Sequence, residues 1–194
     1  MRPLLLASTS PARQALLASL GLPFVAVAPG VDESLTEGVS AEEAVRTLAQ
    51  RKARAVAEKY PLALVLGADQ LGEVEGQLLG KPSGRAAARA QLRALSGRTH
   101  RLLTAVCLLG GGKEETVVEE ARLTFFPLSD TEVEAYLDTE EWEGCAGGYR
   151  VEGRGQALMK SIEGDRTCVQ GLPMLVVVRL LRGRGVPLLG AGIG

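Results

Sequence analysis

The sequence predicts a mixed α/β fold in which two lobes of one compact unit enclose a central cleft. Apolar strand-like runs alternate with helical patterns over the first half of the chain, as they do in α/β proteins. After Thr99 the pattern changes to two longer strands joined by a glycine-rich turn. The chain has 194 residues, of which 46% are apolar, and this is enough for one good core or two small ones. Residues 1–194 contain no repeat, low-complexity tract or linker, so we expect a single domain.

Three hydroxyl residues separate the first expected strand, residues 3–7, from a helix expected over residues 11–20. A proline suits the first helical position, where its missing N–H costs nothing, and Ser10 suits the cap before it. Backbone N–H groups at a helix N-terminus bind anions, so Ser8, Ser10 and Arg13 are candidate phosphate contacts. The alternative is a capped helix that carries a surface arginine.

The clearest helical pattern covers residues 41–59 and follows a short strand expected at 24–28. Ser40 is a good cap, and two glutamates in the first turn suit the positive end of the helix dipole. Lys52 stands on this helix. Its side chain is either solvated or a contact to a phosphate or metal site.

A third expected strand, residues 62–68, is followed directly by Asp69. Open α/β sheets bind ligands outside the carboxyl ends of their strands, so Asp69 is a candidate site residue. The alternative is a turn aspartate that accepts hydrogen bonds from its own backbone. Lys81 lies between a glycine and a proline ahead of a helix at 83–95, and this rigid turn would fix the direction of its ammonium group.

The second half of the chain predicts a hairpin, then a helix, a strand and a final helix. The turn 110–113 joins the two hairpin strands. Ser129 is the expected cap of the helix that follows. The last apolar segment is far shorter than the roughly 20 residues needed to span a bilayer. The expected elements are strands at 100–109 and 115–126, a helix at 129–138, a strand at 155–162 and a helix at 172–181.

Charge and cysteine usage exclude several classes of protein. The formal net charge is −1 and basic residues are interspersed with acidic ones, so we expect no binding to nucleic acid or to an anionic membrane. The three cysteines have no Cys-x-x-Cys spacing, which indicates neither a disulfide framework nor a zinc site. The N-terminal apolar run is too short for a secretion signal. A cytoplasmic location is the simplest expectation.

A series of short motifs follows in order along nearly the whole chain. They are Leu6–Arg13, Asp32–Glu33, Leu48–Ala53, Gly67–Asp69, Gly80–Pro82, Leu95–His100, Ala146–Tyr149, Glu152–Gly153, Ile162–Gly164 and Gly171–Pro173. The chain thereby resembles the Maf family of nucleoside triphosphate pyrophosphatases. The resemblance implies a two-lobed mixed α/β fold like that of inosine triphosphatase, a divalent metal cation, and pairing into a homodimer.

The implied reaction is hydrolysis between the α- and β-phosphates of a nucleoside triphosphate, which expels pyrophosphate. Glu33 and Asp69 are the expected ligands of Mg²⁺ or Mn²⁺, since one or two carboxylates suffice for an ion that keeps several waters. The resemblance also gives Asp69 the role of general base. Arg13, Lys52 and Lys81 would supply positive charge to the β- and γ-phosphates.

Three further positions bear on the choice of base. Gln70 and Glu152 resemble the branch of the family that hydrolyses 7-methyl-GTP, whereas the branch acting on dTTP and UTP has Thr and Gln there. Ala12 matches neither branch, which leaves open a wider and less selective pocket. A carboxylate at Glu152 accepts both donors of the guanine Watson–Crick edge, as an amide cannot. Tyr149 or Trp142 offers an aromatic face to the methylated base, and Glu152 is alternatively a solvated strand residue.

A nucleotide-sensing regulator of septum formation and cell division is the second hypothesis, because the family is associated with that process. A sensor needs only the phosphate contacts, so the intact set of Glu33, Asp69 and Lys81 favours catalysis. His100 is the only histidine and lies in a turn entering a strand, where we expect a structural hydrogen bond. No histidine partner is evident for a cysteine, so we do not expect a thiol nucleophile.

Overall fold

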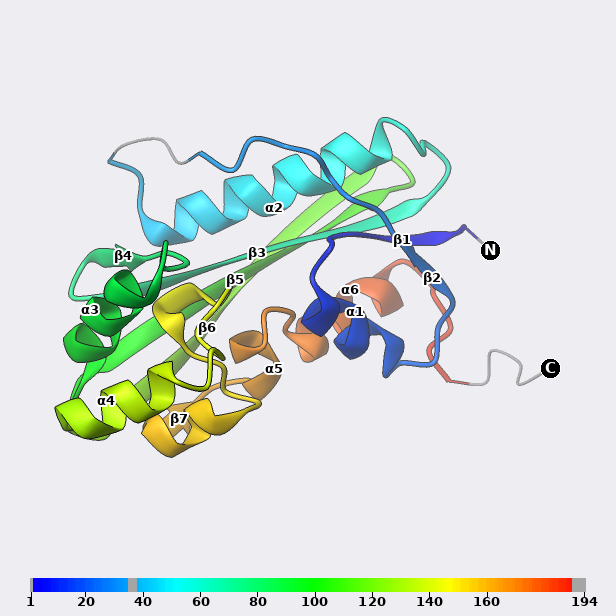
Figure 1. The fold of residues 1–194 in the computed structure, drawn as a ribbon. Coiled ribbons are helices and arrows are strands. Elements are labelled where there is room, and N and C mark those ends of the chain that lie inside the picture. The colour runs from blue at the N-terminus through cyan, green and yellow to red at the C-terminus, as the bar shows by residue number, and fades with distance from the viewer. Residues whose placement is uncertain (1, 35–37, 190–194) are drawn as a thin grey trace.

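The central element of the fold is a mixed β-sheet. The computed structural model describes residues 2–34 and 38–189, and seven strands of this part pair in the order β2-β1-β3-β5-β6-β7, with β4 paired to β3 (Figure 1). Strands β2, β1 and β3 run parallel, and the other pairs are antiparallel. The bounds are β1 Leu4–Ala7, β2 Phe24–Ala26, β3 Leu64–Val74, β4 Gln77–Leu79, β5 Thr99–Gly110, β6 Lys113–Phe125 and β7 Met159–Glu163.

Three of the described helices begin directly after the serine caps that the sequence predicts. Ser10, Ser40 and Ser129 each accept a hydrogen bond from the backbone N–H three residues later, and Ser129 forms a full capping box with Glu132. None of these helices is long and apolar enough to cross a bilayer. The bounds are α1 Pro11–Ala18, α2 Ala41–Ala57, α3 Arg85–Leu95, α4 Asp130–Leu137, α5 Arg166–Val169 and α6 Met174–Gly183, with 3₁₀ turns η1 Ala146–Gly148 and η2 Arg154–Leu158.

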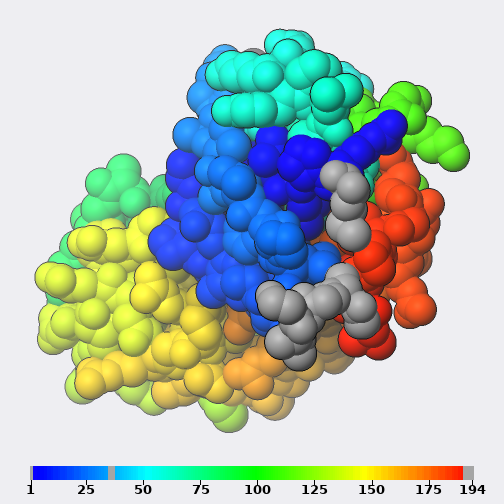
Figure 2. All heavy atoms as spheres, turned by 90° about the vertical axis from the view of Figure 1, so that its right-hand side faces the viewer, coloured from blue at the N-terminus to red at the C-terminus, as the bar shows by residue number. Residues whose placement is uncertain are grey.

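The first lobe is a sheet covered on both faces. Helix α2 lies along one face and α1 and α6 lie on the other (Figure 1). Successive strand residues point to opposite faces, so Val65 packs under α2 while Leu66 packs against α6. Burial on both faces explains why β1 and the first part of β3 are continuous apolar runs in the sequence. In Figure 2 the blue N-terminal segment lies between the cyan end of α2 and the yellow residues of the second lobe.

The second lobe uses the far ends of the same long strands. There β5 and β6, together with β4 and β7, are covered by α3 and α4 around Leu92, Leu123, Phe125 and Leu137. Because β3, β5 and β6 run from one lobe into the other, both lobes share one sheet (Figure 1). The predicted two-lobed α/β architecture is confirmed.

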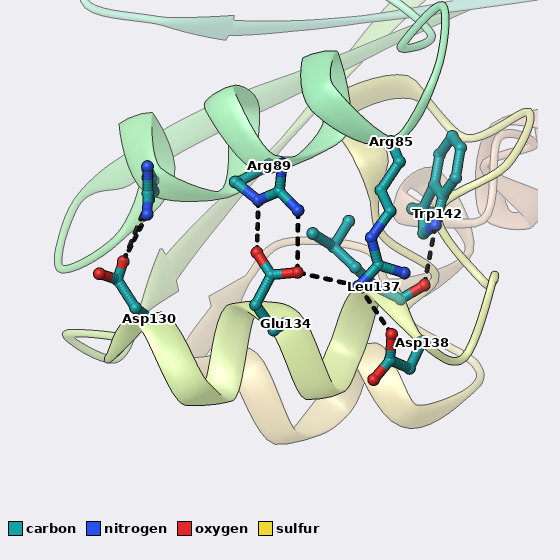
Figure 3. Close-up of polar contacts among 8 residues, drawn as sticks. Arg85, Arg89, Asp130, Glu134, Leu137, Asp138 and Trp142 are labelled. Atoms are coloured by element: carbon teal, nitrogen blue, oxygen red, sulfur yellow. Dashed lines mark hydrogen bonds and ion pairs between the residues drawn. The ribbon is translucent and has the colours of Figure 1, made fainter.

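An ion-pair ladder joins α3 to α4 (Figure 3). Arginines every four residues along α3 face acidic residues every four residues along α4, which places each set on one helix face. These side chains are largely exposed, so each pair contributes less than about 1 kcal/mol and mainly sets the alignment of the helices. The pairs are Arg85 with Glu134 and Asp138, Arg89 with Glu134, and Arg93 with Asp130.

The predicted hairpin is confirmed, and its turn has glycines at the positions whose backbone conformation requires them. The two turn residues are Gly111 and Gly112, with φ of 62° and 75°. Positive φ at both central positions is the requirement of a type I′ turn, whose twist suits antiparallel strands.

Strand β3 corrects a prediction, because it continues to Val74 rather than ending at residue 68. Its partner changes along its length: β1 pairs with it only as far as Gly67, whereas β5 pairs with it through Glu73. Gly67 is therefore not a strand breaker. A Cβ there would overlap the Ala49 carbonyl oxygen and lie 2.7 Å from Ala53 N, so the glycine lets α2 pack closely.

Two other differences concern short elements. The strand expected at 155–162 begins only at Met159, because η2 occupies the preceding residues. The sequence pattern did not predict β4 and α5, which have three and four residues. Elements of this length carry too few periods for a pattern to show.

Candidate active site

A cleft of about 1070 Å³ lies between the lobes. Its walls come from the β1–α1 turn, the segment 28–33, α2, β3, the turn at Gly80, residues 143–152 and residues 169–171. All ten residues predicted for the site line it. They are Ser8, Ser10, Ala12, Arg13, Glu33, Lys52, Asp69, Gln70, Lys81 and Glu152.

The early end of β1 explains why these residues meet. Strand β1 stops at Ala7, opposite Gly67, so the next part of β3 has no neighbour on that side. Asp69 stands on the face of β3 that α2 covers, and Arg13 approaches from the opposite face. At this unpaired edge of β3, side chains from the two faces of the sheet reach the same cleft. Asp69 therefore lies beyond the carboxyl end of β1, although it is inside its own strand, and the turn alternative for it is wrong.

The centre of the cleft is a three-residue ion cluster. Lys52 Nζ lies 2.6 Å from Asp69 Oδ1 and 2.7 Å from Glu33 Oε1. The side chains of Lys52 and Asp69 are only 7% and 9% exposed, whereas that of Glu33 is 57% exposed. A buried ammonium needs such partners, so the solvated alternative for Lys52 is wrong. The hydrogen bond from Lys52, followed by its charge, lowers the pKa of Glu33, and the nearby Lys81 and Arg13 lower it further.

Helix α2 also holds the backbone that carries Glu33. Arg51, the neighbour of Lys52, donates from Nη1 to the Asp32 carbonyl at 2.6 Å. The Asp32 side chain accepts from the Ser34 N–H at 2.9 Å, which makes a local turn. Arg51 and Lys52, consecutive residues of one helix, thus hold the backbone before Glu33 and contact its exposed carboxylate.

Arg13 is tied into the protein rather than left on the surface. Its Nε donates to the Gly171 carbonyl at 2.8 Å and its Nη1 donates to the Ala68 carbonyl at 3.0 Å. Burial lowers the pKa of Arg13, while the negative charges of Asp69 and Glu33 act in the opposite direction. The guanidinium stays protonated and keeps further N–H groups for an anion.

The hydroxyls at the start of α1 organise their own turn. Ser8 is buried and its Oγ accepts from the Ser10 N–H at 3.1 Å. Ser10 Oγ accepts from the Arg13 N–H at 3.4 Å as the helix cap. Both hydroxyl protons stay available to a ligand at the helix N-terminus, where the dipole favours an anion.

The three positions predicted to select the base lie at different depths. Glu152 and Lys81 are exposed at the border of the cleft, and Ala12 is half-buried on α1. Gln70 is different, because its amide Nε2 donates to the carbonyls of Cys168 and Val169, at 2.7 and 3.1 Å. Its donors are therefore used inside the protein.

The aromatic residues have structural surroundings. Trp142 does not line the cleft, and its Nε1 donates to the Leu137 carbonyl (Figure 3), so a stacking role for it is wrong. Tyr149 borders the cleft but is 4% exposed, with its hydroxyl 2.6 Å from His100 Nε2 and its ring edge-on to Phe125. The structural hydrogen bond predicted for His100 is confirmed. Burial lowers the pKa of His100 to about 4, which keeps the ring neutral near neutral pH.

Sequence reasoning gave no role to several residues of the site. Arg150 and Cys145 line the mouth, and burial raises the pKa of the Cys145 thiol, in keeping with an unreactive cysteine. Gly171 contributes a carbonyl, which no side-chain pattern reveals. Thr104 supports Gln70 from β5, and a single hydroxyl among apolar strand residues was the available signal.

The carboxylates fit a divalent cation that arrives with phosphate. Glu33 and Asp69 meet at one ammonium, and each uses one oxygen there. Within 2–34 and 38–189 no group of three or more His, Cys, Asp or Glu side chains is arranged to hold a metal alone. Mg²⁺ commonly binds through one or two carboxylates with substrate phosphates and water, so the pair is a suitable donor set.

Comparison with known proteins agrees with these motifs. Residues 3–184 match the family model described as Maf-like protein. The chain belongs to the Maf family. A Maf relative from Symbiobacterium thermophilum, named dTTP/UTP pyrophosphatase, is 46% identical over 194 residues, covering 100% of both chains. Another from Albidiferax ferrireducens, named 7-methyl-GTP pyrophosphatase, is 42% identical over 193 residues, covering 98% of this chain and 97% of the relative.

The fold also has a distant structural counterpart. The solved structure of the Staphylococcus aureus Ham1 protein superposes with a TM-score of 0.53 at 15% identity, and the match covers 94% of this chain and 100% of that one. At this identity the likeness concerns the fold alone. This Maf chain therefore shares its two-lobed architecture with Ham1.

Proposed function

We propose that the chain hydrolyses 7-methyl-GTP to 7-methyl-GMP and pyrophosphate with a divalent cation, Mg²⁺ or Mn²⁺. Relatives of high identity are named nucleoside triphosphate pyrophosphatases, which are hydrolases acting on acid anhydrides, and this supports the class of enzyme. The observation that carries the proposal is the Glu33–Lys52–Asp69 cluster at the centre of the cleft. It combines carboxylates and a fixed cation, which this reaction requires.

Asp69 is the residue to which we assign the orientation and deprotonation of the attacking water, and its contact with Lys52 supports this role. Its Oδ1 is fixed at 2.6 Å from Lys52 Nζ, and this contact determines where Oδ2 points. Water attack on the α-phosphorus releases a proton, which a positioned carboxylate accepts. The strand and the ion pair hold Asp69 rigidly, so little rearrangement is needed before attack.

Glu33 and Asp69 would hold the cation. When bound, the cation neutralises phosphate oxygens and acidifies water. Glu33 is more than half exposed and comes from a loop, so it can adjust to the triphosphate. Asp69 is the rigid partner of the pair.

The phosphate contacts surround this cluster. Arg13 offers a planar fork for the leaving pyrophosphate, and Lys81 offers a point charge from the turn between β4 and α3. Ser8 and Ser10 donate at the start of α1. Charge that is fixed near the leaving group stabilises it as the bond to the α-phosphorus breaks.

The base preference rests on Glu152 and Ala12. The exposed carboxylate at Glu152 can accept from both N1–H and the amino group of guanine. Methylation at N7 gives the base a positive charge, which strengthens that contact. The small side chain at Ala12 leaves room beside the base. A second candidate is hydrolysis of dTTP and UTP, which the name of the 46% identical relative favours.

The deciding experiment is pyrophosphate release from 7-methyl-GTP, GTP, CTP, UTP and dTTP by the wild type and by Glu152→Gln. We expect 7-methyl-GTP to react fastest with the wild type. We expect Glu152→Gln to lower the rate of pyrophosphate release from 7-methyl-GTP about ten-fold or more, and to change the rate with dTTP little. Faster wild-type turnover of dTTP and UTP would support the second candidate instead. Glu163→Gln, on β7 and outside the cleft lining, is the matched control.

A further inference from the structure

We propose that Gln70 is a positioning residue, which holds the turn at residues 168–171 so that Gly171 aims Arg13 at the phosphates. This inference rests on the proposed role of Arg13 as a phosphate contact. It assigns Gln70 an action on the triphosphate through Arg13, in place of a contact with the base. The evidence is a continuous set of hydrogen bonds from β3 to the guanidinium.

The first link joins β3 to the end of α5. Gln70 Nε2 donates to Cys168 O at 2.7 Å and to Val169 O at 3.1 Å, and lies 3.1 Å from Thr104 Oγ1. Thr104 Oγ1 donates to the same Cys168 carbonyl at 3.0 Å. The Cys168 carbonyl also accepts from the Gly171 N–H at 3.0 Å, so the side chains of Gln70 and Thr104 act together with the backbone to fix where α5 stops.

The second link joins that turn to Arg13. Gly171 has φ of +94°, a conformation that favours glycine, and its carbonyl accepts from Arg13 Nε at 2.8 Å. A Cβ at Gly171 would lie 3.4 Å from Arg13 Nε and 3.7 Å from Gln70 Oε1. Gly171 therefore binds Arg13 through its carbonyl and lies beside the Gln70 side chain. A displaced turn would carry the carbonyl away from the guanidinium.

The third observation is that β3 supplies both supports of Arg13. Arg13 Nη1 donates to the carbonyl of Ala68, two residues before Gln70 on the same strand. One support is direct and the other passes through the 168–171 turn. Two fixed hydrogen bonds define the plane of the fork. A bidentate contact needs placement within about 0.5 Å and 10–20°, so losing one support should misdirect it.

Gln70→Met tests the proposal, because methionine has a similar shape and no amide donors. Gln50→Met is the matched control: Gln50 Nε2 lies 3.2 Å from Thr116 Oγ1, and Gln50 is outside the cleft lining. We expect Gln70→Met to lower kcat/KM about ten-fold by the same factor for every nucleotide, and the control to leave it unchanged. A change confined to the ratio between 7-methyl-GTP and dTTP would overturn the proposal, since it would indicate base contact.

A double-mutant cycle with Arg13→Lys separates positioning from a general loss of structure. If Gln70 acts through Arg13, adding Gln70→Met to the Arg13→Lys variant should lower kcat/KM by less than about two-fold. Fully additive losses would overturn the proposal. Thr104→Val, which removes the other side-chain hydrogen bond to the Cys168 carbonyl, should lower kcat/KM in the same direction by a smaller factor. If Gln70→Met does not fold, the Thr104→Val variant tests the proposal instead. An unchanged kcat/KM in Thr104→Val would then overturn the proposal.

Binding of inorganic tripolyphosphate makes the test independent of the nucleotide that the enzyme prefers. We expect Gln70→Met to weaken calorimetric binding of this base-free probe about ten-fold, and Gln50→Met to leave it unchanged. Equal affinity in the wild type and Gln70→Met would overturn the inference. If the panel instead shows dTTP as the best substrate, the base assignment fails while a loss of tripolyphosphate affinity still supports the positioning role.

Discussion

Replacement of Lys52 by methionine removes the cation from the centre of the cleft while keeping most of the side-chain volume. The nearly buried carboxylate of Asp69 then loses its partner at 2.6 Å, and Glu33 loses a partner at 2.7 Å. Breaking a buried ion pair on one side costs about 3–5 kcal/mol, because one charge stays buried without compensation. The exposed Glu33 adds less than about 1 kcal/mol. We therefore expect a loss of about 3–5 kcal/mol in the free energy of unfolding near neutral pH.

Urea denaturation at several pH values measures this loss. Lys52 lowers the folded-state pKa of Glu33, so the Glu33 share of stability is present above the ordinary value of 4.5. It disappears as pH falls through the lowered folded value. The difference between wild type and variant should therefore narrow in acid. Lys59→Met, at an exposed lysine just after α2, is the control.

The double variant Lys52→Met/Asp69→Asn gives the decisive comparison. Replacing both members of a buried pair removes the uncompensated charge, so the double variant should be more stable than Lys52→Met alone. A double variant that is no more stable than Lys52→Met, or a Lys52→Met loss below about 1 kcal/mol, would refute the reasoning. Either result would mean that the cluster does not store the interaction energy that its geometry implies.

Further predictions concern the reaction and the packing. Asp69→Asn is expected to abolish pyrophosphate release while nucleotide affinity in calorimetry changes little, and near-normal turnover would remove Asp69 from the mechanism. Chelation with EDTA should stop turnover without lowering the Tm of the nucleotide-free protein; turnover that persists in EDTA would exclude the cation. Gly67→Ala should cost about 2 kcal/mol or more in urea denaturation, since its Cβ would overlap the Ala49 carbonyl oxygen, and an unchanged midpoint would contradict that packing.

Local signals in the sequence predicted local structure well. The caps at Ser10, Ser40 and Ser129 depend on contacts within one helical turn, and the glycine pair of the hairpin depends on backbone conformation alone. Such features are visible without knowledge of the rest of the chain. The convergence of Glu33 and Asp69 on one cleft was predicted from motif order and family resemblance rather than from any local pattern.

Non-local features escaped prediction for physical reasons. The length of β3 depends on pairing with β5, some 35 residues later, so the strand could not be seen to continue past Gly67. The contacts of Gln70 lie about 100 residues away on backbone carbonyls, which have no residue-type signal. In the sequence, Lys52 looks the same as a solvent-exposed lysine on a helix. Only the packed structure distinguishes the two.

The most direct test identifies the phosphorus-containing products and locates the oxygen atom that comes from the attacking water. The wild type is incubated with 7-methyl-GTP and Mg²⁺ in heavy-oxygen water, and the products are analysed by phosphorus NMR and mass spectrometry. Attack at the α-phosphorus, which the proposed function requires, gives pyrophosphate and puts the heavy oxygen in 7-methyl-GMP. Release of orthophosphate, or heavy oxygen in the pyrophosphate, would contradict the proposed chemistry.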